Sequence, residues 1–81
     1  MDYTQINEHM EVVGTDGEHV GTVDGIEGNQ IKLTKSDEDA GGEHHFIPFS
    51  AISEVTDVVM LNDTAEGAKS NWQSEQEKYD A

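Results

Sequence analysis

Three groups of residues in this 81-residue chain are of the types that bind ligands or perform catalysis. The first is the acidic segment Asp37-x-Asp39-x-Gly41-Gly42, whose start resembles a calcium-binding loop. Such a loop needs an oxygen-bearing side chain at its fifth position and a bidentate glutamate at its twelfth. Gly41 and Pro48 occupy these positions, so an EF-hand is excluded. A weak cation site at the acidic segment stays open as an alternative.

The second group is the adjacent pair His44-His45. Neighbouring residues of a strand point to opposite faces, so the two imidazoles cannot easily share one ion. A zinc site usually needs three or four convergent ligands, and His9 or His19 would have to come near to complete one. We therefore expect no metal site and no cofactor. One imidazole is expected to pack partly against the core while the other is solvated.

The third group comprises the possible nucleophiles. The chain has no cysteine, and none of its serines lies in a Gly-x-Ser-x-Gly elbow. Neither a phosphate-binding loop nor a dinucleotide fingerprint is present, and the glycines are placed as turns and bulges require. A chain of this size has little room for an enclosed pocket of ~300 Å³ or more. We therefore expect that the protein is not an enzyme.

Net charge excludes further classes of function. Eighteen Asp and Glu residues against four Lys give a charge of −14, and protonating all four histidines changes it only to −14 + 4 = −10. Phosphate binding depends on Lys and Arg, so we expect neither nucleic acid nor an acidic membrane surface as a partner. No apolar run approaches the ~18 residues of a membrane span. We expect the protein in the cytoplasm.

The elements that would position these residues begin with a β-hairpin. Residues 10–14 and 18–27 are β-rich runs joined by a turn at Asp16-Gly17, whose residues tolerate the positive φ of tight turns. Apolar residues of the second run are three apart, which no flat strand can place on one face. Gly21 and Gly25 lie where β-bulges would turn these apolar side chains to the same face of the strand. Two bulges in one strand favour a small barrel over an open sheet.

Further strands and a helix follow. Gly28-Asn29 is predicted as a turn and Asp63 as the N-cap of a C-terminal helix, with Glu66 at its third position and Trp72 docked on the barrel. Ala65, Ala68, Trp72 and Tyr79 share one stripe of that helix. The intervening elements are predicted as strands at 30–36, 43–48, 53–55 and 58–61, a loop at 37–43 and a helical turn at 49–52.

Two segments carry a family resemblance. The run Gly14–Val23 resembles the opening hairpin of PRC-barrel domains, and His45–Ile52, with Val55 and Asp57–Leu61 behind it, is similar to their ending. The longer run from Glu8 to Trp72 resembles a bacterial family of PRC-barrel-like small proteins of unknown function. In that family the motifs that stand here as His44–Pro48 and Asn62–Glu66 recur. The resemblance implies a small barrel of about six strands that acts as a protein-interaction module and not as a catalyst.

The predicted fold is therefore all-β, a small PRC-like β-barrel of about six strands with a C-terminal helix. Residues 1–8 are predicted as a flexible N-terminal arm, 9–76 as the single barrel domain with its helix, and 77–81 as a frayed tail. Trp72 is expected to close one side of the core. The predicted core residues are Val12, Val20, Val23, Ile26, Ile31, Leu33, Ile47, Ile52, Val55, Val58, Met60 and Leu61.

We expect a non-enzymatic protein-interaction or self-association module, with a homodimer as its oligomeric state. The alternatives are an acidic solubilising or stress-protective protein, adapted to high salt, and a weak metal or small-ligand binder. A protein partner should present a basic surface, because the chain is acidic throughout. His44 and Phe49 are expected to face outward, although Phe46 and Phe49 could equally be core. The predicted partner surface consists of His44, His45, Phe46, Phe49, Asp37, Glu38 and Asp39.

Overall fold

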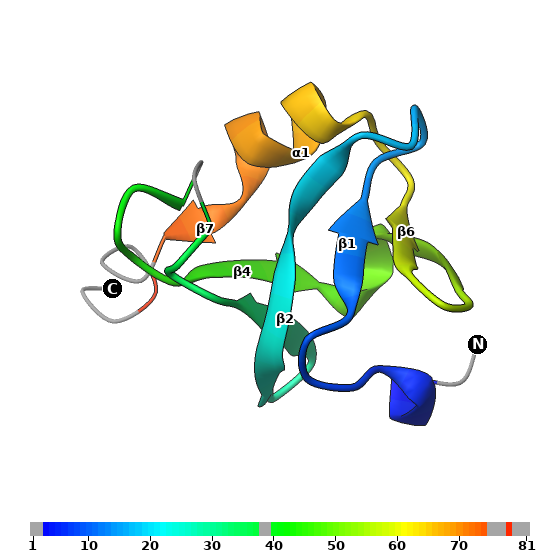
Figure 1. Cartoon of the computed structure of the whole chain (residues 1–81), viewed down its shortest axis with the longest axis horizontal. Helices are drawn as coiled ribbons and strands as arrows, with labels where there is room; N and C mark the ends of the chain where they lie inside the picture. The colour runs from blue at the N-terminus through cyan, green and yellow to red at the C-terminus, as the bar shows by residue number, and fades with distance from the viewer. Residues whose placement is uncertain (1–2, 38–39, 75–77, 79–81) are drawn as a thin grey trace.

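A mixed sheet of seven strands, in the order β5-β6-β1-β2-β3-β4-β7, makes up most of the computed structural model (Figure 1). The structure describes residues 3–37, 40–74 and 78. Neighbouring strands are antiparallel except β1 and β6, which are parallel. The strands are β1 (Glu11–Val13), β2 (His19–Glu27), β3 (Gln30–Leu33), β4 (His45–Pro48), β5 (Ile52–Val55), β6 (Val59–Leu61) and β7 (Gln73–Ser74).

The predicted all-β class is confirmed at the level of a mostly β chain with one short helix. In the described part of the chain, β5 and β7 stand at opposite ends of the hydrogen-bonded order, so the sheet is not closed into a barrel there. The seventh strand, β7, lies where the sequence predicts the helix to continue. The predicted helical turn after β4 is confirmed as the 3-10 helix η3 (Phe49–Ala51).

The predicted hairpin and its two bulges are confirmed. The β1–β2 turn contains Gly17 at a φ of 78°, as a tight turn requires. The register shifts once between His19 and Gly21 and again between Val23 and Gly25. The first shift adds one residue, Val20, to β2, and this bulge allows both Val20 and Val23 to face the core. The turn at residues 28–29 is also confirmed, because Glu27 and Gln30 pair directly across it.

Ile26 was assigned wrongly to the core, since it is 45% exposed. Its cross-strand partner Ile31 is fully buried, and paired residues lie on the same face of a sheet. The exposure of Ile26 is therefore not due to a position on the outer face. Beyond Val23, β2 is paired only with β3, because β1 pairs with the earlier part of β2. Ile26 therefore lies near the hairpin tip with a strand on one side only.

The core cluster draws residues from every strand from β1 to β6. In β6 the core prediction is confirmed for Leu61 but was wrong for Val58 and Met60, which are half-buried, and it missed the buried Val59. The pairing of Val12 with Val59 sets which residues of β6 face the core. Val55 packs against the core and is also half-buried. The buried hydrophobic residues are Ile6, Val12, Val13, Val20, Val23, Ile31, Leu33, Ala40, Phe46, Ile47, Ile52, Val59, Leu61 and Ala65.

The helix α1 (Ala65–Asn71) begins one residue later than predicted and is shorter. Its N-cap is Thr64, whose hydroxyl accepts a hydrogen bond from the Gly67 amide at 3.1 Å, so the assignment of Asp63 as N-cap was wrong. At the other end, Trp72 has extended dihedrals, and its amide donates to the Ala68 carbonyl at 2.9 Å. The chain then enters β7, which pairs with β4. Tyr79 lies outside the described residues.

The turn of the β1–β2 hairpin holds the start of α1 (Figure 1). The Thr15 amide donates to the Asp63 carbonyl at 2.8 Å. The Asp16 carboxylate accepts from the amides of Glu18, at 3.2 Å, and Ala65, at 3.3 Å. This carboxylate therefore satisfies one of the amides that every helix leaves unpaired in its first turn.

The N-terminal segment packs on the sheet. The 3-10 helix η1 (Tyr3–Gln5) occupies part of the segment predicted as an arm, and Ile6 behind it is a core residue that is only 7% exposed. The Tyr3 ring stacks on Phe49, with ring centres 4.3 Å apart. At the other end of the chain, the Lys78 ammonium lies 4.9 Å from the centre of the Phe46 ring, while residues 79–81 lie outside the described part. No helix in the described ranges is long and apolar enough to cross a membrane.

Candidate partner-binding site

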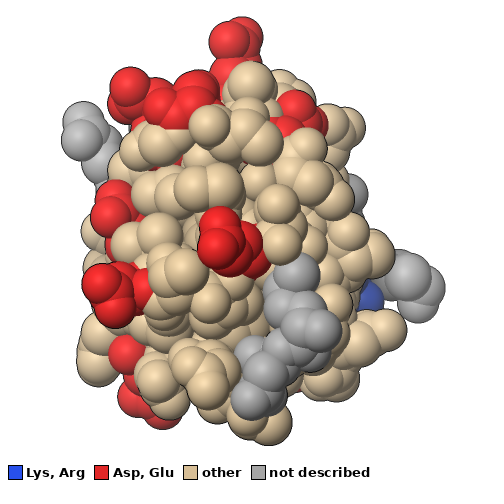
Figure 2. All heavy atoms as spheres, turned by 90° about the vertical axis from the view of Figure 1, so that its right-hand side faces the viewer, with Lys and Arg blue, Asp and Glu red and all other residues tan. Residues whose placement is uncertain are grey.

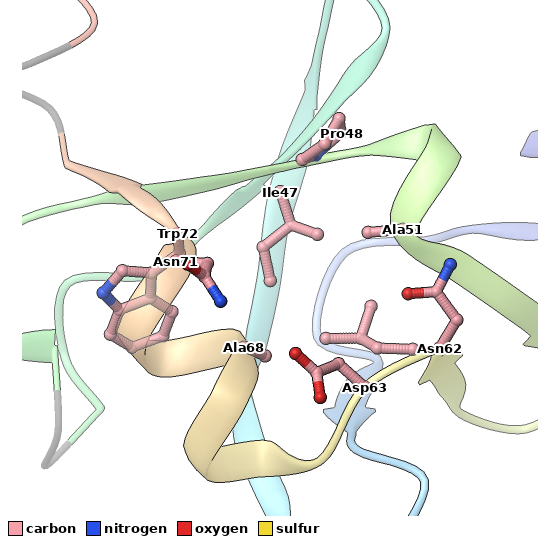
Figure 3. Close-up of a pocket in the computed structure, with 9 residues that line it drawn as sticks. Ile47, Pro48, Ala51, Asn62, Asp63, Ala68, Asn71 and Trp72 are labelled. Carbon is pink, nitrogen blue, oxygen red and sulfur yellow. The ribbon is translucent and has the colours of Figure 1, made fainter.

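An apolar pocket of about 170 Å³ opens between α1 and the ends of β4 and β6 (Figure 3). We call it the α1 pocket. Its apolar lining comes from four elements and from the residue that follows the helix, so it exists only in the folded chain. The lining residues are Ile47, Pro48, Ala51, Leu61, Asn62, Asp63, Ala68, Asn71 and Trp72.

The polar residues of the pocket lie at its rim and are held by the backbone. The Asn62 side chain donates to the Ser50 carbonyl at 3.1 Å, and the Asn71 side chain donates to the Gly67 carbonyl at 2.8 Å. The Asp63 carboxylate accepts from the Thr64 amide at 2.8 Å, and Figure 3 shows it at the pocket edge next to Ala68. The pocket thus combines an apolar interior with a fixed negative charge at its entrance.

Trp72 separates the α1 pocket from a second, open hollow, which we call the acidic depression. The indole stacks on His45, with ring centres 3.9 Å apart and planes 17° from parallel. This stack explains why Trp72 leaves the helical path, since its ring packs on the first residue of β4. The depression measures about 870 Å³, and its lining residues are Asp16, Glu18, Ala40, Gly41, Glu43, His45, Ala65, Glu66, Lys69, Ser70 and Trp72.

A third feature, which sequence reasoning missed, is a histidine held between two carboxylates. His19 lies with Nδ1 at 2.9 Å from Glu11 and Nε2 at 3.0 Å from Asp37. Partial burial lowers the pKa of His19, but the hydrogen bonds and negative charges of Glu11 and Asp37 outweigh it and raise the pKa above 6.5. Only a protonated imidazole can donate to both carboxylates at once. The hairpin register could have placed Glu11 near His19, but no sequence signal places Asp37 there.

The residues of the predicted partner surface are distributed over different environments. Phe46 is fully buried and His45 is 7% exposed, so neither offers area to a partner. His44 is half-buried, with Nδ1 at 2.8 Å from the Leu33 carbonyl oxygen, while the half-buried Phe49 stacks on Tyr3. The surface as such stays a prediction, and its aromatic contact area is reduced to His44 and Phe49.

Of the predicted acidic residues, Asp37 is held within the fold. Its carboxylate accepts hydrogen bonds from Thr22, at 3.5 Å, and Thr34, at 3.4 Å, in addition to its contact with His19. Glu38 and Asp39 lie outside the described residues. Over residues 3–37, 40–74 and 78, no group of three or more His, Asp or Glu side chains is arranged to hold a metal ion.

Comparison with protein-family models matches residues 6–69 to a family described as uncharacterized proteins conserved in bacteria (DUF2171). The matched range begins at the buried Ile6 and ends within α1, so it includes strands β1 to β6 and most of the α1 pocket lining. Comparison with the curated proteins finds no match. The predicted membership of a bacterial family of unknown function is confirmed. Because the match covers well over half of the 81-residue chain, the chain belongs to the uncharacterized bacterial protein family DUF2171.

Proposed function

We propose that the protein is a non-enzymatic protein-interaction module that binds a basic segment of a partner protein at the α1 pocket. The observation that carries the proposal is the pocket itself, an apolar hollow at the surface with Asp63 at its rim. Pockets that enclose a small-molecule substrate usually measure ~300–1,000 Å³, which is larger than this one. A pocket of this size suits a side chain of a partner.

Charge supports the same class of partner. The net charge of −14 creates a negative field around the whole molecule, and Figure 2 shows carboxylates from top to bottom of one face with a single cationic patch at its edge. This field attracts a positively charged partner from a distance, whereas the apolar pocket acts only once the two proteins are in contact. Electrostatic attraction should therefore set the association rate, and the apolar contact should set the lifetime of the complex.

The proposal is tested by capture of proteins from a bacterial lysate on three immobilised forms of the chain. Ala68→Leu fills the α1 pocket, and Ser53→Leu makes a change of similar size at an exposed position of β5 that lines neither hollow. We expect a discrete partner on the wild type and on Ser53→Leu, and its loss on Ala68→Leu. Circular dichroism must show that all three are folded. A partner retained equally by all three would contradict the proposal.

The proposal extends to the finer fold, the oligomeric state and the location. A PRC-like barrel is supported by the motif order at residues 14–23 and 45–61, and by the strong coiling that two bulges give to β2. We propose a homodimer located in the cytoplasm, and the dimer is supported by the small core of a chain of this size. Because repulsion at −14 per chain opposes the dimer, its fraction in light scattering should rise with salt.

A further inference from the structure

The α1 pocket and the acidic depression share one wall, the indole of Trp72. We propose that their occupant is an extended peptide segment with two recognition elements. One aliphatic side chain fills the α1 pocket, and an Arg or Lys nearby in the peptide crosses Trp72 and reaches the carboxylates of the depression. This inference rests on the proposed function and specifies the partner's recognition sequence.

The size and lining of the α1 pocket select the first element. A cavity of about 150 Å³ lined by aliphatic side chains stays dry and takes up a group as large as benzene. The α1 pocket, at about 170 Å³, therefore accommodates one branched aliphatic side chain. Its wall is formed by Ile47, Leu61 and Ala68, which offer no polar atoms to a polar guest. Asp63 at the rim is placed to attract a neighbouring cationic residue.

Trp72 provides the path between the two elements. It is half-buried, and one face of the indole rests on His45. This support fixes the ring, so a ligand does not have to order it on binding. Guanidinium and ammonium groups are attracted to the faces of indole rings, and tryptophan is the best aromatic partner for them. Arg is favoured over Lys because its planar group stacks and also binds carboxylates with two hydrogen bonds.

The depression supplies the opposite charge. Within the described part of the chain, the carboxylates of Asp16, Glu18, Glu43 and Glu66 line it together with one lysine, Lys69. The pocket and the depression therefore select for a peptide that has an aliphatic residue at one position and a cationic residue a few positions away. A second copy of this chain is a poor occupant, since the chain has four lysines and no arginine.

The test begins with a random peptide library displayed on phage and selected on the folded full-length chain. We expect the enriched peptides to combine an aliphatic residue with an Arg or Lys within a few positions. Because Trp72 is the chain's one tryptophan, its fluorescence reports binding of each synthesised peptide directly. Replacing the aliphatic residue by Ala, or the basic residue by Gln, should weaken binding at least about tenfold, the loss typical of an anchor residue.

Variants of the protein locate the two contacts. Asn71→Leu closes the pocket from an exposed rim position and should abolish binding, as should Ala68→Leu, while Ser53→Leu, which lies outside both hollows, should not. Removing the charge of two of these carboxylates with Glu18→Gln and Glu43→Gln should weaken binding and flatten its salt dependence. Lack of enrichment, enriched peptides without basic residues, or unchanged binding to Asn71→Leu would each overturn the inference.

The lysate experiment distinguishes failure of the inferred recognition sequence from failure of the proposed function. If a partner is lost on Ala68→Leu but the selected peptides lack the aliphatic and basic pair, the protein is an interaction module with a different recognition sequence. If capture is independent of the pocket, the proposed function itself is wrong.

Discussion

At the scale of single residues, His19 should make the stability of the protein depend on pH. Its pKa is raised above 6.5 in the folded chain by Glu11 and Asp37. The stabilisation is therefore fully present below pH 6.5, while both carboxylates are ionised, and is lost as the pH rises through the folded-state pKa. Because the His19 side chain is 44% exposed, we expect less than about 1 kcal/mol, the range of exposed ion pairs.

Denaturant unfolding of wild type and His19→Gln between about pH 5.5 and 9 measures this effect, a range in which carboxylates stay ionised. The difference in unfolding free energy should be largest at the acidic end and should shrink toward the alkaline end. Glu11→Gln should reduce the same pH dependence in part. A difference that grows with pH would show that His19 is not stabilised as a cation.

Truncation of Trp72 should destabilise the fold and not only the helix. The indole stacks on His45 of β4 and packs against the core, so its removal leaves a gap between α1 and the sheet. Trp72 is only half-buried, so Trp72→Ala should cost about 2 kcal/mol, less than the ~3–5 kcal/mol of a fully buried tryptophan. Trp72→Phe should recover part of the loss. An unchanged thermal midpoint for Trp72→Ala would mean that the helix is not docked through this side chain.

Residue types alone indicated part of the candidate site. Trp72 was predicted to dock on the sheet, and it lines both hollows. Residues 44–49 were predicted as the contact segment, but burial on both faces of β4 places Phe46 in the core, which simple alternation cannot reveal. Glu11 and His19 lie on the two strands of one hairpin, while Asp37 comes from the segment after β3. Their meeting depends on where the segment after β3 lies, and no local pattern carries that information.

At the scale of elements, the contact between the β1–β2 turn and α1 should be sensitive to one methyl group. A side chain at Gly14 would meet the backbone of the helix start, at the Ala65 amide nitrogen and at 2.7 Å from the Thr64 carbonyl carbon. Backbone cannot move as a flexible side chain can, so Gly14→Ala should cost about 1–3 kcal/mol in unfolding free energy.

Gly25→Ala is the matched control, because a side chain there meets no atom within 4 Å. It should be close to neutral, since it also reduces the entropy of the unfolded chain. Thermal unfolding of the two variants compares them directly. Equal midpoints for both would contradict the close approach of hairpin and helix.

The elements that sequence predicted well have local signals. The turns at residues 16–17 and 28–29, the bulges of β2 and the alternation in β3 each depend on neighbours within a few positions. The misplaced features have distant causes. The end of α1 and the two residues of β7 depend on β4, and the phase of β6 depends on its parallel pairing with β1. Such long-range pairings leave almost no trace in residue spacing.

At the scale of the whole molecule, charge repulsion should limit stability at low salt. A net charge of −14 on 81 residues disfavours the compact state. Raising NaCl from about 0.01 M to 1 M shortens the Debye length from about 30 Å to 3 Å, so the thermal midpoint should rise over this range.

A charge-reduced variant provides the comparison. Replacing the exposed residues Glu8, Asp24 and Asp57 by their amides changes the net charge to −14 + 3 = −11. This variant should melt higher at low salt and gain less from added NaCl. A midpoint that falls as salt is added would show that attractive ion pairs outweigh the repulsion.

The parallel pairing of β1 with β6 also has a consequence for the nascent chain. Strands β1 to β4 leave the ribosome before β6 exists, so β1 then has an uncovered edge where Val12 will later pair with Val59. Unpaired strand edges are templates for aggregation. We therefore expect a fragment ending at residue 56 to form larger assemblies in light scattering than the full chain does. Repulsion between the acidic residues of neighbouring copies would oppose this aggregation while the chain is still being synthesised.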